Sequence, residues 1–347
     1  MKILAPGLVL VLAAPFLDRL AHAPVRGAEV ARRFERRFEL ALEDVSVSYL
    51  VDGTEQPAGE LNAGDETRTE RADARLTDTY VEVEDGRPLK LVRRIEDAQT
   101  LASSVETSPE GVRKEHAQSA KSRLAGARVR FTWDAASASY TAGFDDDAAE
   151  RDEALLRGLS ARVDLAAFLP AAEVAAGDSW EVEASALAVL FRPGGDLALA
   201  PEEPESTGET GGSPFDLDAP QRAAYDSQLA QNLAGTLRAE YLGAREVDGE
   251  QVALIRLAGE VETSAEVSRT LEQEGGGPKV EQSFAYRLEL AGSLAWAADG
   301  LARSLELTGD VELEHAIVQT AEQRGAQHEF RITRTYAGEA ALAMQRE

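Results

Sequence analysis

The dominant pattern along the chain is an alternation of apolar and polar residues with a period of two. It is clearest in residues 127–133, ARVRFTW, where every second residue from Ala127 to Trp133 is apolar. Successive side chains of a β-strand point to opposite faces of a sheet, so this pattern is typical of a half-buried strand. Similar runs occur in both halves of the chain, at residues 45–49, 286–290, 311–314 and 330–333.

Turn dipeptides between these runs predict how the strands are connected. Asp-Gly pairs stand at residues 52–53, 85–86, 248–249 and 299–300. Such pairs readily adopt the positive φ angles of tight hairpin turns. We therefore expect a mostly antiparallel sheet, with hairpins that join residues 78–84 to 88–95, 236–247 to 250–262, and 284–297 to 301–315.

Helical patterns are fewer than strand patterns. Residues 148–159 follow three aspartates, which suit a helix N-terminus, and place Leu155, Leu156 and Leu159 on one side. Residues 220–233 begin with a proline, carry apolar residues at helical spacing and precede Gly235. The expected fold class is mainly β or α+β, with a large, mostly antiparallel, curved sheet and two or three helices packed on it.

The N-terminus has the layout of a secretory signal peptide. Lys2 precedes a short apolar run that ends at Leu17. This run is shorter than the about 20 apolar residues that span a bilayer. Cleavage is expected after Ala21-His22-Ala23, although Pro24 disfavours that position, or after Val25-Arg26-Gly27. The alternative is a buried N-terminal helix in a cytoplasmic protein, against which the early prolines count.

These signals divide the chain into a signal peptide, residues 1–27, and a sheet-rich body, residues 28–347. The body is expected either as one unit or as two halves, 28–192 and 219–347. An acidic loop rich in proline and glycine, residues 193–218, joins these halves and has almost nothing apolar to bury. The predicted localisation is exported, in the periplasm or outside the cell, with no integral membrane span after signal cleavage.

Composition removes several classes of function. The chain has no cysteine, which excludes disulfides, thiolate nucleophiles, cysteine-bound metals and an acylated lipoprotein cysteine. Its formal net charge is -26, and removal of residues 1–27 makes it more negative. Such a surface repels phosphate backbones and anionic lipids, so no nucleic-acid partner is expected.

No motif in the sequence predicts a catalytic, cofactor or metal site. Walker, dinucleotide-binding, Gly-x-Ser-x-Gly and HExxH patterns do not occur. The acidic residues 145–153 do not match a calcium-binding EF-hand loop. His315 has the parity of a buried strand position and is interpreted as a core or sheet-face histidine, and His328 as a surface residue. We therefore expect no cofactor, and the chain is more consistent with a non-enzymatic protein than with an enzyme.

The three tryptophans are the candidate ligand-binding residues. Trp133, Trp180 and Trp296 all stand in or beside strand patterns. Aromatic side chains line many small-molecule cavities, and they also dominate protein cores. The hypothesis is that they line a ligand cavity, and packing in the core is the alternative.

One short segment carries a resemblance to a known group of proteins. Leu169, Pro170 and Val174 precede the turn pair Gly177-Asp178, and Trp180 opens a strand pattern. This arrangement resembles uncharacterised exported bacterial proteins with a leucine-proline, valine, glycine-aspartate-x-tryptophan pattern, and covers well under a tenth of the chain. The resemblance implies a sheet-rich secreted domain of unknown function and supplies no catalytic residue.

Three hypotheses of function follow from the sequence. The first is an exported, non-enzymatic binding or structural protein that holds an apolar or lipid-like small molecule. The second is a hydrolase that cleaves glycans with paired carboxylates. The third is a component of a surface assembly.

Overall fold

The computed structural model describes residues 20–57, 64–145, 152–202, 217–247, 249–270, 278–323 and 325–347. The predicted signal peptide up to residue 19 lies outside the described residues. The strands are β1 Glu29–Val51, β2 Thr54–Gln56, β3 Asp65–Glu84, β4 Arg87–Thr107, β5 Arg113–Ser122, β6 Arg128–Asp134, β7 Ser139–Phe144, β8 Ser179–Glu183, β9 Leu199–Pro201, β10 Ala234–Val247, β11 Glu250–Thr270, β12 Lys279–Ala297, β13 Ala302–Gln323 and β14 Ala326–Arg346. The helices are α1 Ala188–Phe191 and α2 Ala219–Gln231, with 3-10 turns at Glu153–Leu156, Ala166–Phe168 and Ala184–Leu187.

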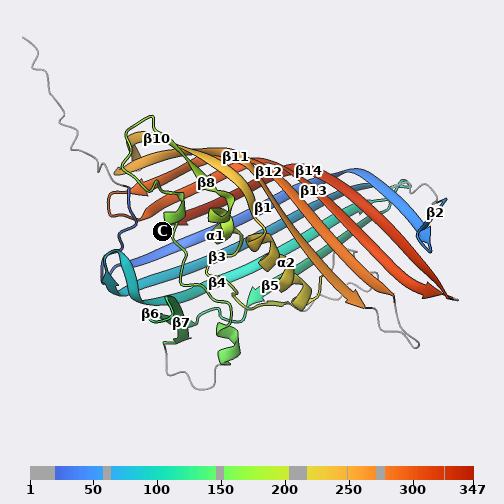
Figure 1. Ribbon diagram of the computed structural model, residues 1–347, viewed down its shortest axis with the longest axis horizontal. Helices are drawn as coiled ribbons and strands as arrows, with labels where there is room; N and C mark the ends of the chain where they lie inside the picture. Colours follow the sequence, from blue (N-terminus) through green and yellow to red (C-terminus); the bar gives the residue numbers. More distant parts are fainter. Residues whose placement is uncertain are drawn as a thin grey trace, which may run out of the picture.

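The described strands form one open, antiparallel sheet (Figure 1). Its main order is β7-β6-β4-β3-β1-β14-β13-β12-β11-β10-β8, and the short strands β2, β5 and β9 pair at the sides. The order follows the chain in two runs that meet where the first long strand, β1, pairs with the last, β14. This arrangement confirms the expected mostly antiparallel sheet.

Hairpins form where the Asp-Gly pairs predict them. Asp85 and Gly86 have φ angles of 48° and 75°, the two positive values of a type I′ turn. This turn joins β3 to β4, and the predicted hairpins β10–β11 and β12–β13 also pair in antiparallel register. Buried and exposed residues alternate along β12 from Lys279 onward, so one face of the sheet takes the apolar side chains.

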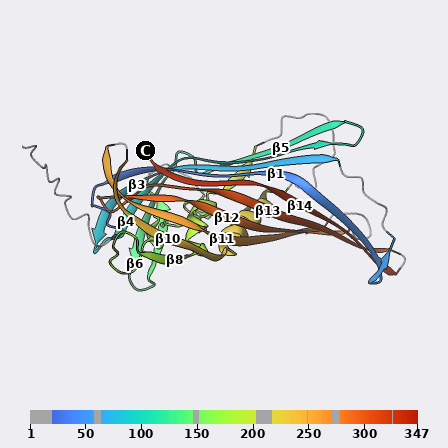
Figure 2. The same ribbon diagram turned by 90° about the horizontal axis from the view of Figure 1, so that it is seen from above.

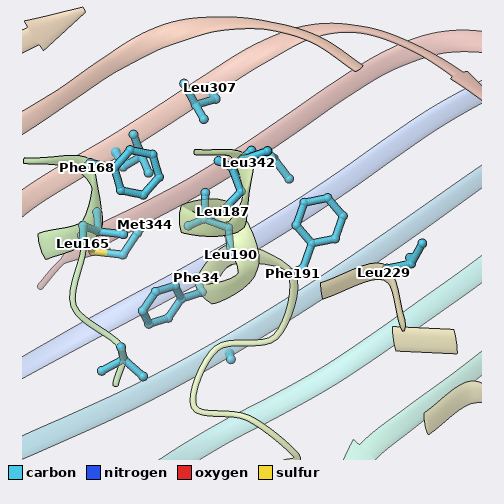
Figure 3. Close-up of a cluster of buried hydrophobic side chains, with 14 of the residues drawn as sticks. Phe34, Leu165, Phe168, Leu187, Leu190, Phe191, Leu229, Leu307, Leu342 and Met344 are labelled. Atoms are coloured by element: carbon cyan, nitrogen blue, oxygen red, sulfur yellow. The ribbon is translucent and has the colours of Figure 1, made fainter. Parts of the chain in front are cut away.

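One face of the sheet is packed against a covering segment, which we define as residues 152–202 and 217–233. This segment includes α1 and α2 (Figures 1 and 2). Figure 3 shows the resulting core, in which Phe34, Leu307 and Met344 of the sheet meet Phe168, Leu187 and Phe191 of the covering segment. We call this face the inner face.

The predicted helix at residues 220–233 is confirmed as α2. Asp218 caps it, since the Asp218 carboxylate accepts from the Gln221 backbone N–H at 2.9 Å and the Gln221 side chain accepts from the Asp218 N–H at 3.0 Å. Such a reciprocal capping box satisfies two amides that have no partner within the helix.

The predicted helix at residues 148–159 is wrong in its described part. Residues 146–151 lie outside the described residues, and only Glu153–Leu156 form a short 3-10 turn. Gly158 then adopts a φ of 78°, which is left-handed and ends helical geometry, and Leu159 pairs with Gly195 as an isolated β-bridge. The leucines nevertheless pack against the core, as their spacing suggested.

The predicted loop 193–218 is described at both ends only, because residues 203–216 lie outside the described residues. Its described beginning is packed, since Leu197 is buried and β9 pairs with β5. No helix in the described ranges is both long enough and apolar enough to cross a membrane.

Candidate functional site

The most distinctive pocket lies at the end of the sheet where the β3–β4 hairpin, the β6–β7 hairpin and the loop 160–164 meet. Its free volume is about 220 Å³. It is lined by His22, Asp78, Tyr80, Gly86, Arg87, Pro88, Leu91, Trp133, Tyr140, Ala161, Arg162, Val163 and Asp164. Three aromatic residues from the sheet thus meet two arginines, and we call this site the aromatic pocket.

Strand register brings the aromatic rings of this pocket together. Trp133 of β6 stands directly opposite Tyr140 of β7, and their ring centroids are 5.1 Å apart in an edge-to-face arrangement. The Arg87 guanidinium lies 4.7 Å from the Trp133 ring centroid, and the Tyr140 hydroxyl donates to the Pro88 carbonyl at 2.6 Å. The two hairpins are therefore fixed to each other at their ends.

A buried ion-paired group forms the back wall. Asp78, 1% exposed, accepts from Arg93 Nε at 2.7 Å and from Arg32 Nη1 at 3.1 Å. Arg93 also donates to the backbone carbonyls of Ser160 and Ala161, at 2.6 and 2.9 Å. Since a single buried residue bonds both the sheet and the loop, the loop 160–164 is held in place as a wall.

The aromatic pocket carries excess positive charge within a strongly acidic chain. The lining residues and the residues bonded to them include four arginines, Arg32, Arg87, Arg93 and Arg162, against the two aspartates Asp78 and Asp164. In the described part of the chain, Arg87 and Arg162 have no carboxylate within ion-pair distance. The arrangement is suited to a ligand with a flat apolar part and an anionic group.

A second polar cluster lies under α2 on the inner face. Glu70 of β3 pairs with Arg68 and accepts hydrogen bonds from the hydroxyls of Tyr225, at 3.0 Å, and Tyr286, at 3.1 Å. Burial would raise the pKa of Glu70, but the charges of Arg68, Arg222 and Arg36 outweigh it and lower the pKa to about 2. This cluster attaches α2 to the sheet, because Tyr225 belongs to α2 and the other bonded groups to the strands.

The histidine predictions have different outcomes. His315 is fully buried on the inner face, stacks on Phe284 with centroids 4.4 Å apart and hydrogen-bonds Gln282 at 3.0 Å. Burial, together with nearby Arg68 and Arg334, lowers its pKa well below the usual value. The core interpretation of His315 is therefore confirmed. His328 is half-buried and shares a 2.5 Å hydrogen bond with the Tyr49 hydroxyl, so it is not the surface residue we expected.

The structure separates the three candidate tryptophans. Trp133 lines the aromatic pocket. Trp296 is only 2% exposed and packs edge-on against His22, a lining residue, with ring centroids 6.3 Å apart. Trp180 of β8 donates from Nε1 to the Phe168 carbonyl at 3.0 Å. Two of the three tryptophans thus lie in or beside one pocket, and the third contacts the covering segment.

The segment that carries the family resemblance forms a turn before β8. The Gly177 N–H donates to the Tyr241 carbonyl at 2.7 Å, and the Asp178 carboxylate accepts from the Ala175 N–H at 2.7 Å. Gly177 has a φ of 97°, which explains the glycine at this position. The segment joins the covering segment to the sheet edge and contributes no residue to the aromatic pocket.

Several pocket residues were missed by sequence reasoning. Tyr80, Tyr140 and Arg87 carry no motif, and only the Asp85-Gly86 turn indicated that Arg87 stands beside a hairpin tip. Among the described residues, no cluster of histidine and carboxylate side chains has metal-binding geometry.

Comparison with known proteins gives no family for this chain: neither a protein-family model nor a curated protein matches it.

Proposed function

We propose that the protein is an exported, non-enzymatic binding protein and that the aromatic pocket holds its ligand. The observation that carries the proposal is the grouping of Trp133, Tyr140 and Tyr80 with two arginines that lack carboxylate partners. The export part rests on the signal-peptide pattern and on the resemblance to exported bacterial proteins.

The pocket favours a small ligand over a long lipid chain. Its free volume of about 220 Å³ is somewhat below the range of roughly 300–1,000 Å³ that is usual for sites of drug-sized molecules. The proposed ligand therefore has one flat apolar face, which contacts the rings, and one anionic group, which the arginines bind.

An apolar site between α1 and α2 is the second candidate. It lies among Phe34, Leu190, Phe191 and Leu197, beside the ion pair between Arg36 and Asp226. Its free volume is only about 60 Å³, room for about two water molecules. A lipid-like ligand would have to displace α2 and break its buried polar contacts, so the aromatic pocket is favoured.

The pocket's carboxylates weigh against the glycan hydrolase. Asp78 and Asp164 both line the pocket, but both Asp78 oxygens accept hydrogen bonds from Arg93 and Arg32. A general acid or nucleophile needs a free carboxyl facing the substrate.

The proposal includes the curvature expected from the sequence. A Cβ at Gly309 would lie 1.8 Å from the Glu289 carbonyl oxygen, and one at Gly338 would lie 1.8 Å from that of Glu39. Glycines at such close approaches are typical of strongly bent or coiled sheets. A bent sheet would help to wrap the inner face around the covering segment.

Calorimetric titration with naphthalene-1-sulfonate, a flat aromatic anion, tests the proposal on protein purified from exporting cells. We expect one saturable site, with affinity about tenfold weaker in the double variant Arg87→Ala, Arg162→Ala, a change of about 1.4 kcal/mol. Arg113→Ala, an exposed arginine at the start of β5, is the control and should bind like the natural protein. Equal affinity in all three proteins, or no saturable binding, would contradict the proposal.

A further inference from the structure

We infer that residues 20–23 cover part of the aromatic pocket, and that signal cleavage removes this cover and adds Trp296 to the pocket wall. The inference rests on the proposed export and on the binding role of this pocket. It concerns how the same site becomes complete.

Residues 20–27 are packed against the pocket end of the sheet. Leu20 is buried in the core, the Ala23 N–H donates to the Gly300 carbonyl at 3.0 Å, and the Gly27 N–H donates to the Tyr80 carbonyl at 2.7 Å. A Cβ at Gly300 would lie 2.8 Å from the Ala23 Cβ, and one at Gly86 would lie 3.2 Å from the His22 carbonyl oxygen. The segment therefore sits closely against the turns of the β3–β4 and β12–β13 hairpins.

His22 stands between the pocket and Trp296. Its side chain lines the aromatic pocket, and its ring meets the Trp296 ring edge-on at 6.3 Å. Trp296 itself is 2% exposed. Both expected cleavage positions, after Ala23 and after Gly27, remove His22 and uncover this side of the indole.

The contact between His22 and Trp296 is poorly satisfied. His22 Nδ1 and Trp296 Nε1 are both buried without a hydrogen-bond partner among the described residues. Each such atom costs about 1–3 kcal/mol, and buried polar groups in proteins nearly always have partners. Two unpartnered polar atoms side by side are unusual for a permanent wall and are explained if the cover is temporary.

Removal of the cover gives the pocket the donor that an anionic ligand needs. The Trp296 Nε1–H can only donate, so a sulfonate, carboxylate or phosphate oxygen is a suitable partner. The processed pocket would then combine the arginines, the rings of Trp133 and Tyr140, and one indole N–H. The unprocessed chain would bind the same ligand more weakly.

Acrylamide quenching of tryptophan fluorescence tests the uncovering without any ligand. The protein carries Trp133→Phe and Trp180→Phe, which leave Trp296 as the single tryptophan, and is compared as the full chain and as the chain that begins at Pro24. We expect the quenching constant to rise several-fold and the emission to shift to longer wavelength in the shorter chain. His22→Ala in the full chain, which keeps the chain whole, should produce a smaller change in the same direction.

The control is the variant Trp133→Phe, Trp296→Phe, in which Trp180 reports and quenching should not change on shortening. Unchanged quenching of Trp296 in both the shorter chain and the His22→Ala variant, with unchanged circular dichroism, would overturn the inference. That result would leave the binding of naphthalene-1-sulfonate at Trp133 untouched. Raised quenching without any binding of naphthalene-1-sulfonate would instead contradict the proposed function alone.

Discussion

Buried charges are the residues whose change the fold tolerates least. Glu70 and Asp78 both lie on the inner face, and each bonds arginines that are themselves buried. Loss of one partner leaves an uncompensated charge away from water, which costs about 3–5 kcal/mol. These carboxylates therefore fix α2 and the loop 160–164 to the sheet.

Glu70→Gln tests the first of these contacts through its pH dependence. The folded-state pKa of Glu70 is lowered from 4.5 to about 2, so its contribution to stability is present above pH 4.5 and is lost as the pH falls toward 2. We expect the variant to be about 3 kcal/mol less stable at neutral pH and to approach the natural protein near pH 2. Urea unfolding at several pH values measures this difference, and Glu314→Gln, an exposed residue of β13, is the control. A difference that does not depend on pH would contradict the assignment.

Asp78→Asn tests the back wall of the aromatic pocket. The neutral amide leaves Arg32 and Arg93 without their counter-ion, so the free energy of unfolding should fall by about 3 kcal/mol. Asp310→Asn, exposed on β13, should change it by less than about 0.5 kcal/mol. Equal urea midpoints for the two variants would show that Asp78 does not hold the pocket together.

Sequence reasoning at the residue scale reached only what parity or composition reveals. The position of His315 followed from alternation along its strand, and Trp133 was a candidate because tryptophan is rare in the chain. Arg87, Tyr80 and Arg162 come from three separate segments whose meeting depends on register between strands. Register is set by long-range packing, which a single sequence does not encode locally.

At the scale of elements, local turn chemistry was the reliable signal. The Asp-Gly pairs located the hairpins, and a proline with helical spacing located α2. The helix expected at 148–159 failed because leucines at helical spacing also suit a turn that packs on a core. The glycines inside the long strands had no interpretation from the sequence, since only the neighbouring strand shows why a side chain is excluded there.

Gly309→Ala tests this exclusion. The added Cβ would lie 1.8 Å from the Glu289 carbonyl oxygen, so the backbone of β12 or β13 must shift. We expect a loss of about 2 kcal/mol, which thermal unfolding would detect as a lower midpoint. Gly143→Ala is the matched control, because a Cβ at Gly143 in β7 meets nothing within 4 Å. Equal midpoints would mean that the strands are less closely approached than the structure indicates.

At the scale of the whole molecule, the pairing of β1 with β14 was beyond the sequence. The two strands stand at opposite ends of the chain, and nothing local in either indicates the other. Their pairing joins strands from both halves in one sheet and leaves β7 and β8 as the edges of the main path. The aromatic pocket lies at one end of this sheet, formed by hairpins from its first part and by the loop of the covering segment.

The central claim is that this pocket holds a small anionic ligand, and native mass spectrometry of protein purified from exporting cells tests it most directly. The account predicts an adduct that is lost on denaturation and is absent from the variant Trp133→Ala, Arg87→Ala. A clean, unliganded mass for the natural protein, or an adduct that persists in the variant, would contradict it.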